Sequence, residues 1–254
     1  MMERELRFGE TLRTQSSVVG TWIKTPSPIV CEVLSRTALD VLVLDAEHAP
    51  FGRSELDSCI AISRALGKSV LIRVPDASAA SILNALDCGA NGILVPHVIS
   101  AEDAIRAVRA AQHGPGGRGY AGSTRAAEFG GRALGEQLTH ARSHTTVIAQ
   151  IEDGEALAQI DAIVRVPGLS AVFVGRVDLT VSLGKTNLDD PAVLDAVTAI
   201  VRAACAAGCP VGMFVANLNE IPHWRAQGVT FFVLASDHAF LQSGVKSLLA
   251  HFDR

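Results

Sequence analysis

The sequence is poor in charged and aromatic residues and contains no long apolar run. Charged residues make up 19% of the 254 positions and aromatic residues 5%, whereas hydrophobic residues make up 48%. This composition provides a large apolar core and excludes an intrinsically disordered chain. No apolar stretch approaches the roughly 18 residues that span a bilayer, and residues 1–10 lack the apolar segment of a secretory signal. We therefore expect a cytoplasmic protein that does not bind membranes.

The sequence also lacks an excess of positive charge and a pattern of paired cysteines. Its 22 lysines and arginines and 26 aspartates and glutamates give a formal net charge of −4, so no nucleic-acid partner is expected. The five cysteines are odd in number and form no C-x-x-C pair. They are better explained as reduced structural thiols than as a disulfide framework or a zinc site.

Short apolar segments alternate with amphipathic, helix-like segments along the whole chain. The expected strands are residues 18–22, 41–45, 70–74, 92–95, 147–151, 171–174, 211–215 and 231–234. Such runs are typical of parallel strands that are buried on both faces. Eight strand–helix units in 254 residues predict a single-domain (β/α)8 TIM barrel spanning residues 1–254, with an open doubly wound sheet as the alternative. The irregular stretch 113–144 is expected to hold a short helix near 133–141.

Polar side chains occur where four of the expected strands end. His48 follows the second strand, Arg73 ends the third, Glu152 follows the fifth and Asp178 follows the sixth. Active sites of barrels lie at the carboxyl ends of the strands. Glu152 and Asp178 on neighbouring strands would repel each other unless a cation or a proton lay between them, and Mg²⁺ or Mn²⁺ is often held by one or two carboxylates. The alternative is that each carboxylate caps a helix or pairs with a surface base.

His48 and Arg73 are the candidate catalytic groups. Histidine titrates near neutrality and suits proton transfer, although His97 also follows a strand and competes for this role. A guanidinium at position 73 could hold a carboxylate or stabilise an enolate oxygen; alternatively, it forms an internal ion pair with Asp45 or Asp87. Trp22 closes the first strand and is either a wall of the site or core.

Residues 114–119 formally match the G-x-G-x-x-G dinucleotide motif. That motif must follow a strand and open a helix, but here it follows a helix-like segment and contains Pro115. We therefore expect a loop at this position and no nucleotide cofactor.

The polar residues belong to segments that resemble the HpcH/HpaI aldolase family, which includes 4-hydroxy-2-oxoheptanedioate and 2-dehydro-3-deoxyglucarate aldolases. The matching segments are residues 45–50 (DAEHAP), 86–93 (LDCGANGI), 117–119 (GRG), 150–152 (QIE) and 175–179 (GRVDL). They keep the family's order and span most of the chain. The resemblance implies a barrel of the phosphoenolpyruvate/pyruvate superfamily type. It also implies a class II aldolase that cleaves 4-hydroxy-2-oxo acids to pyruvate and an aldehyde through a metal-bound pyruvate enolate.

The resemblance also implies roles for single residues. Glu152 and Asp178 would bind a divalent ion (Mg²⁺, Mn²⁺ or Co²⁺), and His48 would be the general base. Asp87 would raise the basicity of His48, and Arg73 would stabilise the enolate. The 2-oxo acid would contact Gln150, the main chain at Val177, Asp178 and the wall formed by Trp22.

Family members exchange their last helix, here residues 240–252, within dimers that assemble into a hexamer, so the resemblance also implies a trimer of dimers. Two departures from the family bear on acceptor choice. Arg176 stands where many relatives have proline, and residues 114–119 differ from the usual Pro-Pro-x-Gly-x-Arg-Gly loop.

Four other functions compete with a metal-dependent aldolase. A Schiff-base aldolase would need a lysine at a strand end, for which Lys24 is the candidate. A lyase acting on acyl-CoA thioesters, of the citrate lyase β-subunit or malyl-CoA lyase type, is the alternative within the superfamily. A non-catalytic metabolite-binding barrel and a phosphate-binding barrel enzyme are the remaining two. A phosphate-binding enzyme would need a glycine-rich turn after the seventh or eighth strand, and residues 235–237 contain no glycine.

Overall fold

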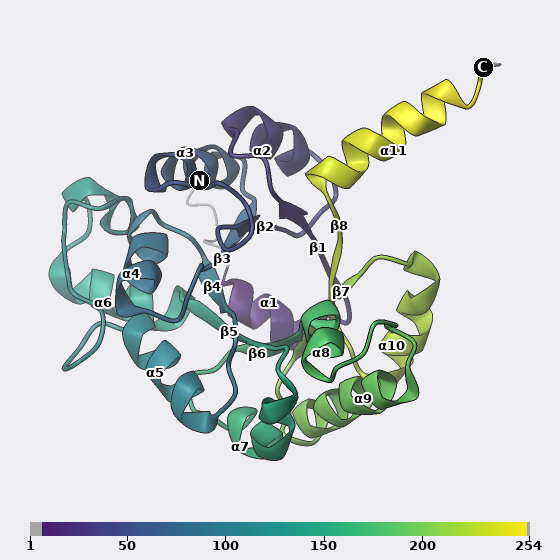
Figure 1. Cartoon of the computed structure of the whole chain (residues 1–254). Coiled ribbons are helices and arrows are strands. Elements are labelled where there is room, and N and C mark those ends of the chain that lie inside the picture. Colours follow the sequence, from purple (N-terminus) through teal and green to yellow (C-terminus); the bar gives the residue numbers. More distant parts are fainter. Residues whose placement is uncertain (1–6, 253–254) are drawn as a thin grey trace.

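The chain folds into a closed barrel of parallel strands surrounded by helices (Figure 1). A computed structural model describes residues 7–252. Each strand pairs with the next along the chain, and β8 closes the barrel by pairing with β1. The strands are β1 (Val18–Ile23), β2 (Val41–Asp45), β3 (Ser69–Arg73), β4 (Gly92–Val95), β5 (Thr146–Ile151), β6 (Ala171–Val174), β7 (Val211–Val215) and β8 (Phe231–Ser236).

Helices connect the strands and cover the outside of the barrel. The α-helices are α1 (Phe8–Thr14), α2 (Pro28–Ser35), α3 (Arg53–Ala65), α4 (Ala79–Asp87), α5 (Ala101–Ala111), α6 (Leu134–His144), α7 (Ile160–Ile163), α8 (Arg176–Ser182), α9 (Pro191–Ala206), α10 (Ile221–Gln227) and α11 (Asp237–Leu249). Short 3-10 helices are η1 (Arg125–Gly130), η2 (Gly154–Gln159) and η3 (Leu218–Glu220). The predicted (β/α)8 barrel is therefore confirmed, whereas the termini 1–6 and 253–254 of the predicted domain lie outside the described residues.

Apolar side chains form two cores, one on each side of the strands. Inside the barrel, Phe173 and Phe231 pack edge to face, with their ring centroids 5.8 Å apart. Helix α1 closes one end of this inner core, because its Phe8 ring lies 5.9 Å from that of Phe231. The outer core lies between strands and helices and includes fully buried Leu42 and Ile93. With both faces covered, the strands carry the continuous apolar runs seen in the sequence.

The loop regions follow local rules that position the helices. The Ser100 hydroxyl accepts a hydrogen bond from the main-chain N–H of Asp103 at 3.1 Å, which caps α5 at its amino end. Residues 114–119 follow α5 rather than a strand, as expected for a loop. The short helix expected near 133–141 is α6, which extends to His144.

Helix α11 begins at the mouth of the barrel and then projects away from it (Figure 1). Its base is fixed because the buried carboxylate of Asp237 accepts hydrogen bonds from the main-chain N–H groups of Lys24 (2.8 Å) and Thr25 (2.9 Å).

The five cysteines are free thiols. Within residues 7–252, none of the helices has both the length and the apolar character that crossing a bilayer requires.

Candidate active site

The carboxyl ends of the strands surround a cavity of about 360 Å³. Several residues expected at the site line it: Trp22, His48, Arg73, Gln150, Val177 and Asp178. They come from five different strand ends or the loops that follow them. The barrel topology thus brings together side chains that are up to 156 positions apart, counting from Trp22 to Asp178.

A buried ion pair between Arg73 and Asp45 forms the floor of the site. Arg73 Nε and Nη2 donate to the two oxygens of Asp45 at 2.9 and 2.7 Å, which is a bidentate contact. Burial alone would raise the pKa of Asp45, but the charge and hydrogen bonds of Arg73 lower it below its ordinary value. The face of Trp22 covers the guanidinium, with Cζ of Arg73 4.4 Å from the ring centroid. Trp22 therefore belongs to the inner core of the barrel and also forms a wall of the cavity.

Lys24 forms an ion pair with the same carboxylate, that of Asp45. Its Nζ lies 3.1 Å from Oδ2 of Asp45. A Schiff-base lysine needs a desolvated amine that is free to attack a carbonyl, whereas the Lys24 side chain is 31% exposed and its amine is held by Asp45. The geometry therefore disfavours Lys24 as a nucleophile.

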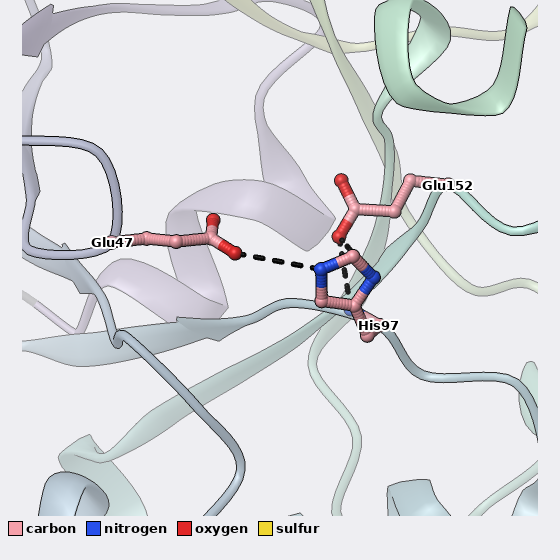
Figure 2. A group of neighbouring side chains, drawn as sticks. All are labelled: Glu47, His97 and Glu152. Atoms are coloured by element: carbon pink, nitrogen blue, oxygen red, sulfur yellow. Dashed lines mark hydrogen bonds and ion pairs between the residues drawn. The ribbon is translucent and has the colours of Figure 1, made fainter. Parts of the chain in front are cut away.

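Glu47, His97 and Glu152 form a compact cluster beside this floor (Figure 2). Figure 2 shows the His97 ring between the two carboxylates, with Nε2 3.6 Å from Glu47 and Nδ1 3.5 Å from Glu152. The main-chain N–H of His97 donates to Glu152 Oε1 at 2.9 Å, and His97 adopts the left-handed φ of 54°. Such a backbone conformation in a non-glycine residue is uncommon and concentrates at functional sites.

The cluster carries more negative than positive charge. Burial raises the pKa of Glu47 despite the opposing charge of Arg73, and the nearby Glu152 raises it further. A hydrogen bond to Asp153 raises the pKa of His97, and the charges of Glu152 and Glu47 add to the effect. Carboxylates that recruit a proton or a cationic ring in this way provide the environment that a divalent cation prefers.

Gln150 and Gly175 hold Glu152 in place. Gln150 Nε2 donates to Glu152 Oε2, while Gln150 Oε1 is buried and has no hydrogen-bond partner among the described residues. A Cβ atom at Gly175 would lie 2.7 Å from Glu152 Oε2 and 2.8 Å from Glu152 Cβ. Glycine at this position is therefore required for the close approach of the carboxylate. The buried oxygen atoms and the unpartnered acceptor fit a site for a hard cation.

Gly175→Ala tests this packing. The new methyl group is expected to displace Glu152 and to weaken Mn²⁺ affinity by about 10–100-fold, which is typical when a ligand's supporting contact is lost. Isothermal titration calorimetry with MnCl₂ measures the change. Gly135→Ala on α6 is the matched control, because no atom lies within 4 Å of its added Cβ. Equal Mn²⁺ affinity in both variants would contradict the assigned position of Glu152.

Arg176 lines the cavity, and its guanidinium ties three segments together. Its guanidinium pairs with Glu220 in η3 and with Asp189 at 2.8 Å, and it donates to the carbonyl of Leu188 at 2.9 Å. Trp224 Nε1 donates to the same Glu220 carboxylate at 3.1 Å. The departure from the family's proline thus anchors the first turn of α8, which carries Val177 and Asp178 with exposed side chains.

The structure places His48 and Asp87 at different ends of the barrel. His48 follows the end of β2; its main-chain N–H donates to Asp45 Oδ1 at 3.1 Å, and its ring Nε2 lies 3.7 Å from Glu47. Asp87 ends α4 on the connection into the start of β4, where burial raises its pKa against the charges of Arg118 and others. Within one chain, the role predicted for Asp87 beside His48 is therefore not supported.

Glu47 is the site residue whose role the sequence left unassigned. It belongs to the DAEHAP segment, between the strand-end residue Asp45 and the candidate base His48. Its Oε2 lies 3.2 Å from Arg73 Nε, so Arg73 bridges Asp45 and Glu47. The sequence does contain a signal for this role: Asp45 and Glu47 are two residues apart, and side chains at that spacing share one face of an extended segment.

Comparisons with known proteins identify the family to which the chain belongs. A family model described as HpcH/HpaI aldolase/citrate lyase matches residues 18–243. A hydroxypyruvate/pyruvate aldolase from Paraburkholderia phytofirmans is 32% identical over 246 residues, which cover 94% of each chain. A 5-keto-4-deoxy-D-glucarate aldolase from Salmonella arizonae is 31% identical and covers 98% of this chain and 97% of its own.

A solved structure has the same fold. The crystal structure of an HpcH/HpaI aldolase/citrate lyase family protein from Burkholderia cenocepacia matches with a TM-score of 0.91 at 29% identity, covering 96% of this chain and 97% of that one. The predictions of the family and of an aldolase-type lyase are thus confirmed. The chain belongs to the HpcH/HpaI aldolase/citrate lyase family.

Proposed function

We propose that the protein is a class II aldolase that reversibly cleaves 4-hydroxy-2-oxo acids to pyruvate and an aldehyde. The observation that carries this proposal is the carboxylate cluster around buried Glu152, which adjoins a fixed guanidinium, Arg73, that lines the cavity; Glu47 of the cluster lies 3.2 Å from Arg73 Nε. The names of the relatives, a hydroxypyruvate/pyruvate aldolase and a 5-keto-4-deoxy-D-glucarate aldolase, support the reaction class.

Glu152 and Asp178 would hold a divalent ion such as Mg²⁺, Mn²⁺ or Co²⁺. When bound, such an ion would stabilise the negative charge that develops on the 2-oxo acid. Glu152 is buried against Gly175, and Asp178 lines the cavity from the first turn of α8. The His97 ring, between Glu47 and Glu152, marks a second position in the same carboxylate cluster.

The remaining residues orient the substrate and move its proton. His48 accepts the proton of the 4-hydroxyl group while the bond between C3 and C4 breaks and its electron pair passes toward the 2-oxo group. Arg73 stabilises the resulting negative charge, and Asp45 keeps its guanidinium in one orientation. Gln150 Oε1, which has no partner among the described residues, would accept a hydrogen bond from a substrate hydroxyl group, and the indole of Trp22 would exclude water on one side.

Pyruvate release from 4-hydroxy-2-oxo acids tests the proposal. Enzyme stripped with EDTA should release no pyruvate, and added Mg²⁺, Mn²⁺ or Co²⁺ should restore release, as followed with lactate dehydrogenase and NADH. Cleavage of a CoA thioester, with no turnover of free 4-hydroxy-2-oxo acids under any of these ions, would instead identify an acyl-CoA lyase.

We further propose that the chain forms a homo-oligomer in which α11 packs on a second copy, within the hexamer that the family resemblance implies. Apolar side chains are exposed on α11 and on the neighbouring α2: Phe240, Leu241, Val245, Leu248, Leu249, Ile29 and Val33. An apolar surface of this extent is typical of a protein interface.

Leu241→Glu together with Leu248→Glu is expected to dissociate this oligomer, because both substitutions place charges in an apolar interface. Light scattering coupled to size-exclusion chromatography measures the mass, and Gln242→Glu on the same helix is the control that should keep the wild-type mass. A monomeric wild-type protein at micromolar concentration would rule out the proposed assembly.

A further inference from the structure

The cavity has two chemically different sides. The strands β2, β3, β5 and β6 contribute the polar groups that would hold the 2-oxo acid. The opposite side comes from β7, β8 and the base of α11, and it is lined by Phe214, Ala216, Ala235, Ser236 and Ala239. These side chains are small or apolar and carry no charge, and the Ser236 hydroxyl accepts a hydrogen bond from the N–H of Ala239 at 3.3 Å.

The cations around the cavity already have carboxylate partners. Among the described residues that line it, Lys24 and Arg73 pair with Asp45, at 3.1 and 2.7 Å. Arg176 pairs with Asp189 and Glu220. An anionic group on the β7–β8 side would have to lose its water without gaining an unpaired cation from the described residues of the same chain, which is costly.

The space is large enough for a second molecule beside pyruvate. A volume of about 360 Å³ lies within the range of roughly 300–1,000 Å³ that is usual for small-molecule sites. Pyruvate has only six non-hydrogen atoms and fills part of such a space. The alanine side chains at 216, 235 and 239 keep the β7–β8 side open, and Ala235 does so with a strained φ of 50° at the end of β8.

We infer that the β7–β8 side of the cavity receives an uncharged aldehyde with an alkyl or aryl substituent and discriminates against aldehydes that carry a carboxylate or a phosphate. This inference rests on the proposed function and names the acceptor class of the same site. In the addition direction, C3 of pyruvate loses one proton and bonds to the aldehyde carbon. The electron pair of the aldehyde C=O passes to its oxygen, which takes up a proton.

The test compares two acceptors of equal size. 4-Methylpentanal and succinic semialdehyde have the same number of non-hydrogen atoms. The first ends in an isopropyl group where the second has a carboxylate. With full-length enzyme, Mn²⁺ and pyruvate, kcat/KM is expected to be at least about tenfold higher for 4-methylpentanal, because the buried carboxylate stays unpaired. An equal or higher kcat/KM for succinic semialdehyde would overturn the inference.

An added cation should reverse this preference. Ala239→Arg places a guanidinium at the base of α11, and it is expected to bring the two kcat/KM values within about threefold of each other. The control Ala226→Arg, on an exposed position of α10, should keep the wild-type ratio. Circular dichroism checks that both variants are folded. If Ala239→Arg does not fold, the ratio of the two kcat/KM values in the wild-type enzyme decides the question alone.

The inference and the proposed function fail differently. Exchange of the methyl protons of pyruvate with solvent deuterium needs no acceptor and reports the proposed function alone. Exchange without addition to 4-methylpentanal overturns the inference about the acceptor. Absence of both exchange and addition overturns the proposed function on which it rests.

Discussion

Replacing Arg73 with methionine should lower the free energy of unfolding by about 3 kcal/mol at neutral pH and kcat/KM by about 10²–10³-fold. The stability loss follows because Asp45 is fully buried, so the lost guanidinium leaves its charge with Lys24 and the main-chain N–H of His48 as the partners seen among the described residues. The activity loss follows because the guanidinium would no longer stabilise charge on the substrate. Urea unfolding and pyruvate release measure the two effects.

The controls separate the buried charge from the chemistry. Arg165→Met removes an exposed ion pair with Asp161 and should change stability by no more than about 0.5 kcal/mol. Adding Asp45→Asn to Arg73→Met removes the unpaired charge and should recover stability but not activity. Recovery of activity in the double variant would contradict a direct role for Arg73.

The loss caused by Arg73→Met should also depend on pH. In the wild-type protein the pKa of Asp45 is lowered, so its ion pair stabilises the fold above the ordinary carboxyl pKa of about 4 and loses this effect as pH falls through the folded pKa. In the variant, burial raises the pKa of Asp45. The difference in unfolding free energy should therefore be largest near neutral pH and shrink as pH falls, first above about pH 4, where Asp45 of the variant takes up a proton, and then below it, where the wild-type ion pair is lost; a difference independent of pH would argue against this cause.

Glu152→Gln should weaken Mn²⁺ binding by more than about 100-fold, because even the loss of a supporting contact costs 10–100-fold and this change removes a ligand charge. The substitution keeps the size of the side chain, so the packing against Gly175 is preserved. Calorimetry with MnCl₂ measures binding, and pyruvate release should fall in parallel. Unchanged Mn²⁺ affinity would remove Glu152 from the site.

Two further variants distinguish the ligands that accompany Glu152. Asp178→Asn should weaken Mn²⁺ binding to a similar extent, whereas His97→Gln should change it by only a few-fold. The opposite order would move the metal to the Glu47–His97–Glu152 cluster.

The strands could be predicted almost residue by residue because they are buried on both faces. The expected 41–45, 92–95, 171–174 and 211–215 coincide with β2, β4, β6 and β7. The remaining strands differ by one or two residues, as at β8, where polar Ser236 continues the strand beyond the apolar run. Pairing between strands also extends to residues such as Thr146 that hydropathy alone does not select.

The site could be predicted only in part, because single positions do not reveal which side chains meet. The strand ends predict the shared mouth of the barrel, and an ion pair of Arg73 with Asp45 is one of two alternatives that the sequence leaves open. The direction of Arg176 depends on Glu220, 44 positions away, and the sequence alone cannot indicate that contact. The placement of Asp87 depends on α4 returning to the start of β4, which places it away from His48.

Proton exchange on pyruvate tests the central claim most directly, because it requires enolate formation at this cavity and nothing else. Enzyme stripped of metal, then supplied with Mg²⁺, should exchange the methyl protons of pyruvate with deuterium from D₂O, as followed by proton NMR. Exchange should require the added ion and should fall at least about 100-fold in Glu152→Gln and Arg73→Met. Exchange that proceeds equally without metal, or equally in these variants, would contradict an enolate stabilised by the cation site and by Arg73.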